Sequence, residues 1–253
     1  MKYAIVTGAS RGLGAAAAEQ LLAENYHLVD ISRSGNESLG KKAEEMNDMS
    51  YTHIKADLSS SEQTQSVMEE WLTDIKKSSP EEILLIQNAG TVEPIEVTGK
   101  LDSEKINYAV QLNYVTPVCM ANALLASLEE LDTRVIIVNI TSGAADKPNH
   151  GWSIYGSTKA ALNLFTETAA LEHQNRHPEV KIISFSPSIM DTDMQQVIRS
   201  SSSKAFAQVE RFQEYKKQGK LRTPEQVASA LVHLVINDDL QSGKLYHIND
   251  FLN

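Results

Sequence analysis

The order of the local sequence patterns constrains the fold of this 253-residue chain more than any other feature. Short runs rich in β-branched residues alternate with longer stretches of helical pattern along the whole chain. The predicted strands are residues 2–8, 27–32, 51–58, 82–90, 134–142, 180–187 and 244–249. The predicted helices are residues 13–25, 37–46, 62–77, 103–129, 153–175 and 223–237. This alternation predicts an α/β fold, a doubly wound parallel sheet of about seven strands with helices on both faces.

Local signals support individual elements of this prediction. Residues 82–90, "EILLIQNAG", are almost continuously apolar, which is typical of a strand covered on both faces. Val67, Trp71 and Ile75 recur every four residues and give one helix a single apolar stripe. We find no linker, repeat or low-complexity segment, so we expect residues 1–253 to form one domain.

Charge and cysteine content exclude several classes of function. The chain has 23 Lys and Arg against 33 Asp and Glu, a net charge of −10 with no basic block, so we expect neither nucleic acid nor an anionic membrane as a partner. Cys119 is the one cysteine, which excludes an intramolecular disulfide, and the scattered histidines predict no catalytic metal. No apolar run approaches the roughly 20 residues of a membrane helix, and the N-terminus has no signal-like pattern. We expect a cytoplasmic protein.

The first predicted strand runs into a glycine-rich loop, "TGASRGLG" at residues 7–14. Gly8, Gly12 and Gly14 permit a tight turn and remove side chains that would hold a pyrophosphate away from backbone N–H groups. A helix follows at once, and its N-terminus carries partial positive charge. The spacing is GxxxGxG rather than GxGxxG, but the strand–loop–helix context predicts a dinucleotide site.

The end of the second predicted strand, "DISRS", bears on which dinucleotide binds. A carboxylate at this position binds the adenosine ribose of NAD, whereas a cation accommodates the 2′-phosphate of NADP. Arg33 follows the strand and Arg11 lies in the glycine loop, so two cations can converge on one phosphate. Asp30, on the same strand face as Ser32, is the alternative: a ribose-binding carboxylate. We expect NADP(H).

A phenol and an amine lie one helical turn apart in "YGSTK", residues 155–159. Residues four apart share a helix face, so Tyr155 and Lys159 can reach one ligand. An ordinary tyrosine, with a pKa of about 10, is a poor acid–base catalyst near neutral pH. We expect the ammonium of Lys159 and an oxidised nicotinamide to lower the pKa of Tyr155.

Other polar residues follow neighbouring predicted strands, where parallel α/β sheets bind their ligands. Ser142 ends one strand, and its hydroxyl can donate to a substrate oxygen. Asn88, Ala89 and Gly90 end another. Asn113 lies inside a predicted helix, where a buried amide needs a partner.

Taken in order, these pieces resemble the short-chain dehydrogenase/reductase family over essentially the full chain. The matching pieces are "TGASRGLG" (7–14), "DL" (57–58), "NAG" (88–90), Asn113, Ser142 and "YGSTK" (155–159). The resemblance implies a Rossmann fold, a catalytic tetrad of Asn113, Ser142, Tyr155 and Lys159, and homodimers or homotetramers packed through helices 103–129 and 153–175. Motif and resemblance together predict these cofactor-binding residues: Gly8, Ser10, Arg11, Gly12, Leu13, Gly14, Ser32, Arg33, Asp57, Leu58, Asn88, Ala89, Gly90, Tyr155, Lys159, Pro187, Ile189 and Thr192.

Two stretches narrow the resemblance. "GWSIY" (151–155) and "MDTDMQQVIRS" (190–200) are similar to sepiapterin reductases and to bacterial benzil reductases. Ser188 stands where the family commonly has a glycine after Pro187. The aspartate with which sepiapterin reductases anchor the pterin aligns with His247, unless Asp250 takes that place. The missing anchor argues against a pterin substrate.

The resemblance implies reduction of a small-molecule ketone, an α-diketone or a sepiapterin-like substrate, by NADPH. Tyr155 would donate the proton, Ser142 would bind the carbonyl oxygen, Lys159 would bind the nicotinamide ribose, and Asn113 would position a water. The alternatives are an NAD-dependent alcohol dehydrogenase of the same family and a cofactor-binding regulator without turnover.

Residues 190–222 follow the sixth predicted strand and mix apolar side chains with serines and charges. We interpret them as a lid over an aromatic ketone; the alternative is a fixed surface hairpin. The predicted substrate-binding residues are Ser142, Trp152, Tyr155, Met190 and Met194.

Overall fold

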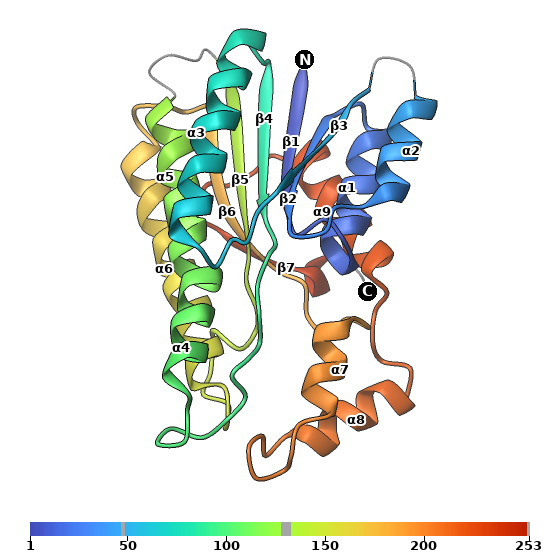
Figure 1. The fold of residues 1–253 in the computed structure, drawn as a ribbon, viewed down its shortest axis with the longest axis vertical. Helices are drawn as coiled ribbons and strands as arrows, with labels where there is room; N and C mark the ends of the chain where they lie inside the picture. Colours follow the sequence, from blue (N-terminus) through green and yellow to red (C-terminus); the bar gives the residue numbers. More distant parts are fainter. Residues whose placement is uncertain (47–48, 128–132, 252–253) are drawn as a thin grey trace.

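The computed structural model describes residues 1–46, 49–127 and 133–251. Within these ranges, seven parallel strands form one sheet in the order β3-β2-β1-β4-β5-β6-β7 (Figure 1). The strands are β1 (Lys2–Thr7), β2 (His27–Ser32), β3 (Tyr51–Lys55), β4 (Glu82–Gln87), β5 (Arg134–Ile140), β6 (Val180–Ser186) and β7 (Leu245–His247). The predicted doubly wound fold is confirmed, and the strand order reverses between β1 and β4, where such sheets bind ligands.

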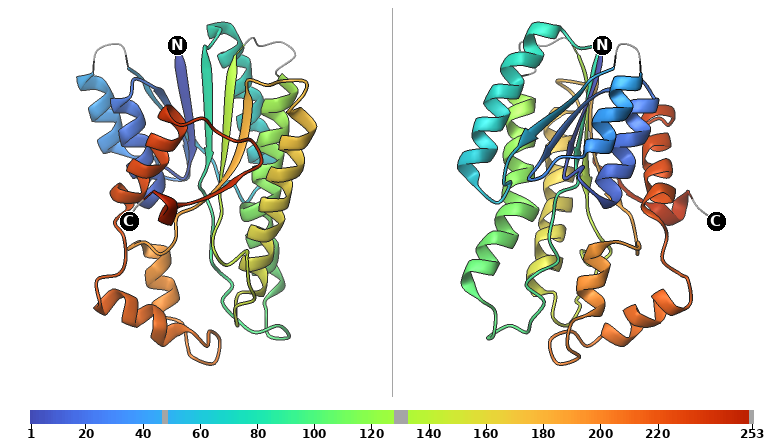
Figure 2. Two further views of the ribbon diagram at one scale, coloured as in Figure 1. Left: turned by 180° about the vertical axis from the view of Figure 1, so that it is seen from behind. Right: turned by 45° about the vertical axis from the view of Figure 1, so that its right-hand side comes forward.

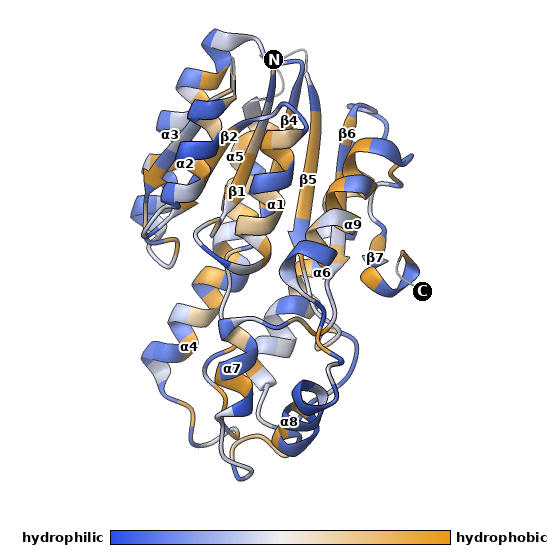
Figure 3. Ribbon diagram, turned by 90° about the vertical axis from the view of Figure 1, so that its right-hand side faces the viewer, coloured by the Kyte–Doolittle hydropathy of each residue, from blue (hydrophilic) through white to orange (hydrophobic). Residues whose placement is uncertain are grey.

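Helices cover both faces of the sheet (Figure 2). One face carries α1 (Gly12–Ala23), α2 (Glu37–Glu45) and α9 (Pro224–Asn237). The other carries α3 (Ser61–Ser78), α5 (Thr116–Ala126) and α6 (Ser153–His173). Apolar residues concentrate in the strands and on the inner sides of the helices, whereas the outer sides are largely hydrophilic (Figure 3).

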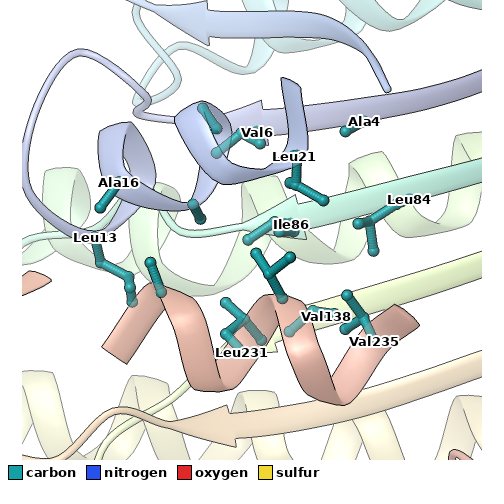
Figure 4. Close-up of a cluster of buried hydrophobic side chains, with 14 of the residues drawn as sticks. Ala4, Val6, Leu13, Ala16, Leu21, Leu84, Ile86, Val138, Leu231 and Val235 are labelled. Atoms are coloured by element: carbon teal, nitrogen blue, oxygen red, sulfur yellow. The ribbon is translucent and has the colours of Figure 1, made fainter. Parts of the chain in front are cut away.

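The core consists of two apolar layers, one on each side of the sheet. On the first, Leu21 of α1 and Leu231 and Val235 of α9 pack over Ile86 and Val138 (Figure 4). On the second, the predicted stripe of α3 is buried. β4 is buried along its whole length, which explains why its sequence is almost continuously apolar.

One predicted helix is interrupted. Residues 103–129 form α4 (Ser103–Val110), a π-helical turn (Gln111–Val115) and α5, while residues 128 and 129 lie outside the described residues. Pro117 has no N–H to donate to the carbonyl of Asn113, four residues earlier, so a regular α-helix cannot continue. The N–H of Thr116 donates instead to the carbonyl of Gln111, five residues back.

Residues 190–222 form α7 (Asp193–Arg199) and α8 (Val209–Lys217), which project beyond the carboxyl ends of the strands (Figure 1). The two ends of this segment meet: the Asp191 N–H donates to the Arg222 carbonyl at 2.9 Å, and the Arg222 N–H donates to the Ile189 carbonyl at 3.2 Å. Residues 190–222 therefore leave the body of the protein and return to it at nearly the same point, and we call this segment the excursion. Among the described helices, none combines the length and apolar character needed to cross a membrane.

Candidate active site

A cleft of about 1160 Å³ opens where the strands end. Its walls come from the glycine loop, the segments after β2, β4, β5 and β6, the first turns of α6, and the 190–222 excursion. Every predicted site residue lines this cleft except Gly14 and Asn113. The fold thus brings together residues that are far apart in sequence.

The glycine loop is shaped by backbone constraints. Gly8 and Gly12 adopt φ angles of +71° and +59°, which favour glycine. A Cβ on Gly14 would lie 2.4 Å from the Gly8 carbonyl oxygen and 2.5 Å from Nδ2 of Asn88. Gly14 therefore permits close packing behind the cleft rather than lining it, and Asn88 fixes the loop by donating to the carbonyls of Thr7 (3.0 Å) and Gly8 (3.3 Å).

The N-terminus of α1 faces this cleft with no side-chain cap and no acidic residue in its first turn. Its first N–H groups and its partial positive charge are thus available to an anion. The small glycine-lined loop beside it leaves room for a pyrophosphate. These residues fit a dinucleotide.

Asp30 is fully buried and is not among the residues that line the cleft. Its Oδ1 accepts from the backbone N–H of Ala9 at 3.3 Å, and its Oδ2 accepts from the Tyr51 hydroxyl at 2.9 Å. Burial, assisted by the Asp30 carboxylate, raises the pKa of Tyr51 to about 12, so this phenol stays protonated and donates. Asp30 holds the glycine loop against β3.

Two arginines line the cleft beside the glycine loop and the segment after β2. Arg33 is exposed and makes no hydrogen bond or ion pair within the described ranges, whereas Nη1 of Arg11 pairs with Oδ2 of Asp193 at 2.7 Å. Hydrogen bonds from Ser59 hold the pKa of Asp57 below its usual range, and the charge of Arg33 adds to this effect. Asp57 is therefore ionised near Arg33.

Tyr155 and Lys159 lie in the first two turns of α6, and both are buried. Nζ of Lys159 donates to the carbonyl of Ile140 at 2.8 Å, and burial lowers the pKa of this amine to about 8. Burial raises the pKa of Tyr155, and a hydrogen bond with Ser142 offsets this only in part. Contrary to the expectation, Lys159 does not lower the pKa of Tyr155, because desolvation dominates, whereas a lowering by an oxidised nicotinamide stays a prediction.

Asn113 is fully buried in the π-helical turn. Its Oδ1 accepts from the N–H of Thr91, and its Nδ2 donates to the Thr91 carbonyl, both at 2.8 Å. Nδ2 also donates to Oγ1 of Thr158 at 3.3 Å. Because Thr158 lies between Tyr155 and Lys159 on α6, the Asn113 side chain links the segment after β4 to α6.

Aromatic side chains form the other end of the cleft. Trp152 stacks on Phe206 with 4.6 Å between ring centroids and meets Tyr155 edge-on at 5.5 Å. Gly151 (φ +86°) permits this packing, because a Cβ there would lie 2.1 Å from the Ala205 carbonyl oxygen. The 190–222 excursion therefore shares an apolar cluster with the residue predicted to donate the proton.

The sequence reasoning missed residues of α4 and of the π-helical turn that also line the cleft. These are Lys105, Tyr108 and Leu112, and α4 lies on the side of the molecule opposite α7 and α8 (Figure 1). Their spacing of three and four residues places them on one helix face, and this was the available signal. Pro117 was likewise the available signal for the π-helical turn.

The sequence departs from the family pattern at Ser188 and at the pterin-anchor position, and the structure shows the surroundings of both. Ser188 lines the cleft and adopts a φ of +59°, the conformation that a glycine would take without strain. Neither His247 nor Asp250 is among the lining residues; Oδ2 of Asp250 instead accepts from the backbone N–H of His247 at 3.3 Å. In the part of the chain that the structure describes, no group of three or more His, Cys, Asp or Glu side chains is arranged to hold a metal.

Comparison with known proteins gives consistent relationships. The sequence profile described as "short chain dehydrogenase" matches residues 2–203. A benzil reductase ((S)-benzoin forming) of Bacillus subtilis (strain 168) is 37% identical over 252 residues, covering 100% of both chains. A sepiapterin reductase of Meriones unguiculatus is 30% identical over 249 residues, covering 94% of this chain and 93% of that protein. Among solved structures, the KRED1-Pglu enzyme superposes with a TM-score of 0.80 at 26% identity, covering 97% of this chain and 100% of that one.

Proposed function

The chain belongs to the short-chain dehydrogenase family, and we propose that it is an NADPH-dependent carbonyl reductase that reduces one carbonyl of an α-diketone. The observation that carries this proposal is the meeting of Ser142, Tyr155 and Lys159 in the cleft that also contains the glycine loop. The similarity to benzil reductases supports the substrate class, and the absence of His247 and Asp250 from the cleft argues against a pterin.

When bound, NADPH supplies the hydride for the carbonyl carbon. Tyr155 donates the proton to the carbonyl oxygen, and its raised pKa keeps the phenol protonated for this role at neutral pH. Ser142 donates a hydrogen bond to the same oxygen and stabilises the negative charge that develops there. Lys159, largely charged below its pKa of about 8, binds the nicotinamide ribose.

Asn113 acts from behind the cleft. In this proposal its amide positions the segment that contains Gly90, since a Cβ on Gly90 would lie 3.1 Å from Oδ1 of Asn113 and 3.6 Å from Nζ of Lys159. A water held beside Lys159 remains part of the proposal for proton supply.

The choice of NADPH over NADH rests on the charge of Arg11 and Arg33, at the end of the cleft where we place the adenosine. Arg33 faces the cleft without an ion-pair partner among the described residues, so a 2′-phosphate would be its counterion. The Arg11–Asp193 pair is exposed and contributes only about 0–1 kcal/mol, so a phosphate can replace Asp193. Asp30, the basis for the NAD-dependent alternative, is already bound by Ala9 and Tyr51.

Substitution of Arg33 by alanine tests this choice. We expect R33A to raise the KM for NADPH about tenfold, the loss of one charge-assisted hydrogen bond, with little change in the KM for NADH. Steady-state rates with the two cofactors measure this, and Lys55→Ala, a cation on the neighbouring strand outside the cleft, is the control. A wild-type preference for NADH, or an equal effect of R33A on both cofactors, would refute NADPH specificity.

We further propose that residues 190–222 form a lid. Their narrow base at Met190 and Arg222 and the ion pair of Asp193 with Arg11 of the glycine loop support this role. NADPH should then protect the segment, with its exposed Lys204, Lys216 and Lys217, from limited trypsin digestion. Identical cleavage with and without NADPH would favour the fixed hairpin.

A homodimer or homotetramer is the final part of the proposal. Leu164 and Leu171 are each 65% exposed and lie two turns apart on α6, an apolar face that a second copy would cover. Sedimentation equilibrium measures the assembly, and a monomer would contradict it.

A further inference from the structure

The charged side chains that line the cleft fall into two groups, and one group consists of residues that we assign to the cofactor. The other charged lining residues are Lys105, Lys147, Arg211, Glu93, Asp191 and Asp193. Asp191 pairs with Lys216, and Asp193 pairs with Arg11. Within the described part of the chain, Glu93 is therefore the acid of this second group that has no cation beside it.

The three cations of the second group are exposed, and none of them pairs with an acid among the described residues. They come from three separate elements: Lys105 from α4, Lys147 from the loop after β5, and Arg211 from α8. Because the whole chain carries a net charge of −10, this surplus of unpaired positive charge is a local property of the cleft. A cleft lined by one sign of charge attracts a ligand of the opposite sign.

Arg211 is held in place with its outer donors free. Its Nε donates to the hydroxyl of Tyr215, and its guanidinium carbon lies 5.3 Å from the centre of the Tyr215 ring. Nη1 and Nη2 have no acceptor among the described residues, and together they match the two oxygens of a carboxylate. Arg211 lies in the first turn of α8, where the helix dipole disfavours a cation, so helix stability does not explain it.

The Arg211 guanidinium is connected to the reacting centre through aromatic contacts. The ring of Tyr215 meets that of Phe212 at 5.8 Å, and Phe212 meets Trp152, the neighbour of Tyr155, at 5.5 Å. We propose that Arg211 binds a carboxylate on the substrate, so that the preferred substrates are 1,2-diketones that carry a carboxylate. The two lysines add attraction at longer range. This inference rests on the proposed reductase function and deepens it by naming the charge of the substrate.

The test compares benzil-4-carboxylate with its methyl ester, because the two probes share the diketone and differ by one charge. Values of kcat/KM with NADPH are measured for the wild type, R211Q and R211K. We expect R211Q to lose about fivefold with the carboxylate, mainly through KM, and less than about twofold with the ester. R211K should lose less with the carboxylate, because it keeps the charge but not the two-pronged donor. Lys217→Gln, which removes an exposed cation of α8 outside the cleft, should change neither probe by more than about twofold.

Salt gives a second readout that needs no variant. Raising the ionic strength from about 0.02 to about 0.5 M should lower kcat/KM of the wild type for the carboxylate and leave that for the ester nearly constant. An equal effect of R211Q on both probes, or an equal effect of salt on both, would overturn the carboxylate site and leave the reductase proposal intact. A wild type that reduces neither probe nor benzil would refute the proposed function instead. Calorimetric binding of the two probes to the NADP⁺ complexes of the wild type and R211Q would then decide the carboxylate site by the same comparison.

Discussion

Replacement of Tyr155 by phenylalanine should abolish benzil reduction and leave NADPH binding almost unchanged. The variant removes one oxygen from a buried ring that already meets Trp152 edge-on, so the packing survives. Without the phenol no proton donor remains beside Ser142, and loss of general acid catalysis costs about 10²–10⁴-fold in kcat. The loss of NADPH absorbance, followed by stopped-flow or steady-state kinetics, measures turnover, and a fluorescence titration measures NADPH binding.

Tyr108→Phe is the matched control, because it removes the same atom from another tyrosine that lines the cleft. Tyr108 lies on α4 and is 37% exposed, so we expect its loss to change kcat by less than a factor of about three. Wild-type turnover in Y155F, or an equal loss in Y108F, would remove Tyr155 from its assigned role.

The second large effect is expected for Gly14→Ala. The added Cβ would approach the Gly8 carbonyl oxygen to 2.4 Å and Nδ2 of Asn88 to 2.5 Å. The first of these neighbours is a backbone atom. The glycine loop must then shift away from the N-terminus of α1, so the backbone donors no longer converge on a pyrophosphate. We expect the Kd for NADPH to rise about a hundredfold and the free energy of unfolding to fall by about 1–3 kcal/mol.

Gly40→Ala provides the comparison for this variant. Gly40 lies within α2, and a Cβ there would meet Tyr51 at an ordinary 3.5 Å. Alanine favours the helix by about 1 kcal/mol, so this variant should be equally or more stable and bind NADPH normally. Tight NADPH binding by G14A would show that the close contact behind the loop is not what shapes it.

The parts of the fold and site that depend on local pattern were predictable from sequence. The alternation of strands and helices gave the parallel sheet, and the four-residue spacing of Tyr155 and Lys159 placed both at the start of α6. The glycine loop, Ser142 and the segment after β4 reach one cleft because parallel strands end at one edge of a sheet.

The parts that depend on long-range contacts were not predictable. The role of Asp30 depends on Tyr51, whose hydroxyl donates to it from a neighbouring strand. Arg11 pairs with Asp193, which lies 182 residues later in the sequence. The direction of the Tyr155 pKa shift depends on the burial of this side chain in the packed structure, which no local spacing reveals.

Transfer of a hydride from NADPH to the carbonyl carbon is the central step of the proposed reaction, and deuterium labelling tests it directly. Benzil and NADPH carrying deuterium at both C4 positions are incubated with the wild type and with Y155F, and the benzoin is analysed by mass spectrometry. We expect the wild type to form benzoin with one deuterium on the carbinol carbon, in a one-to-one ratio with the NADPH consumed, and Y155F to form almost none. Benzoin without deuterium, or no benzoin from the wild type above the rate without protein, would contradict it.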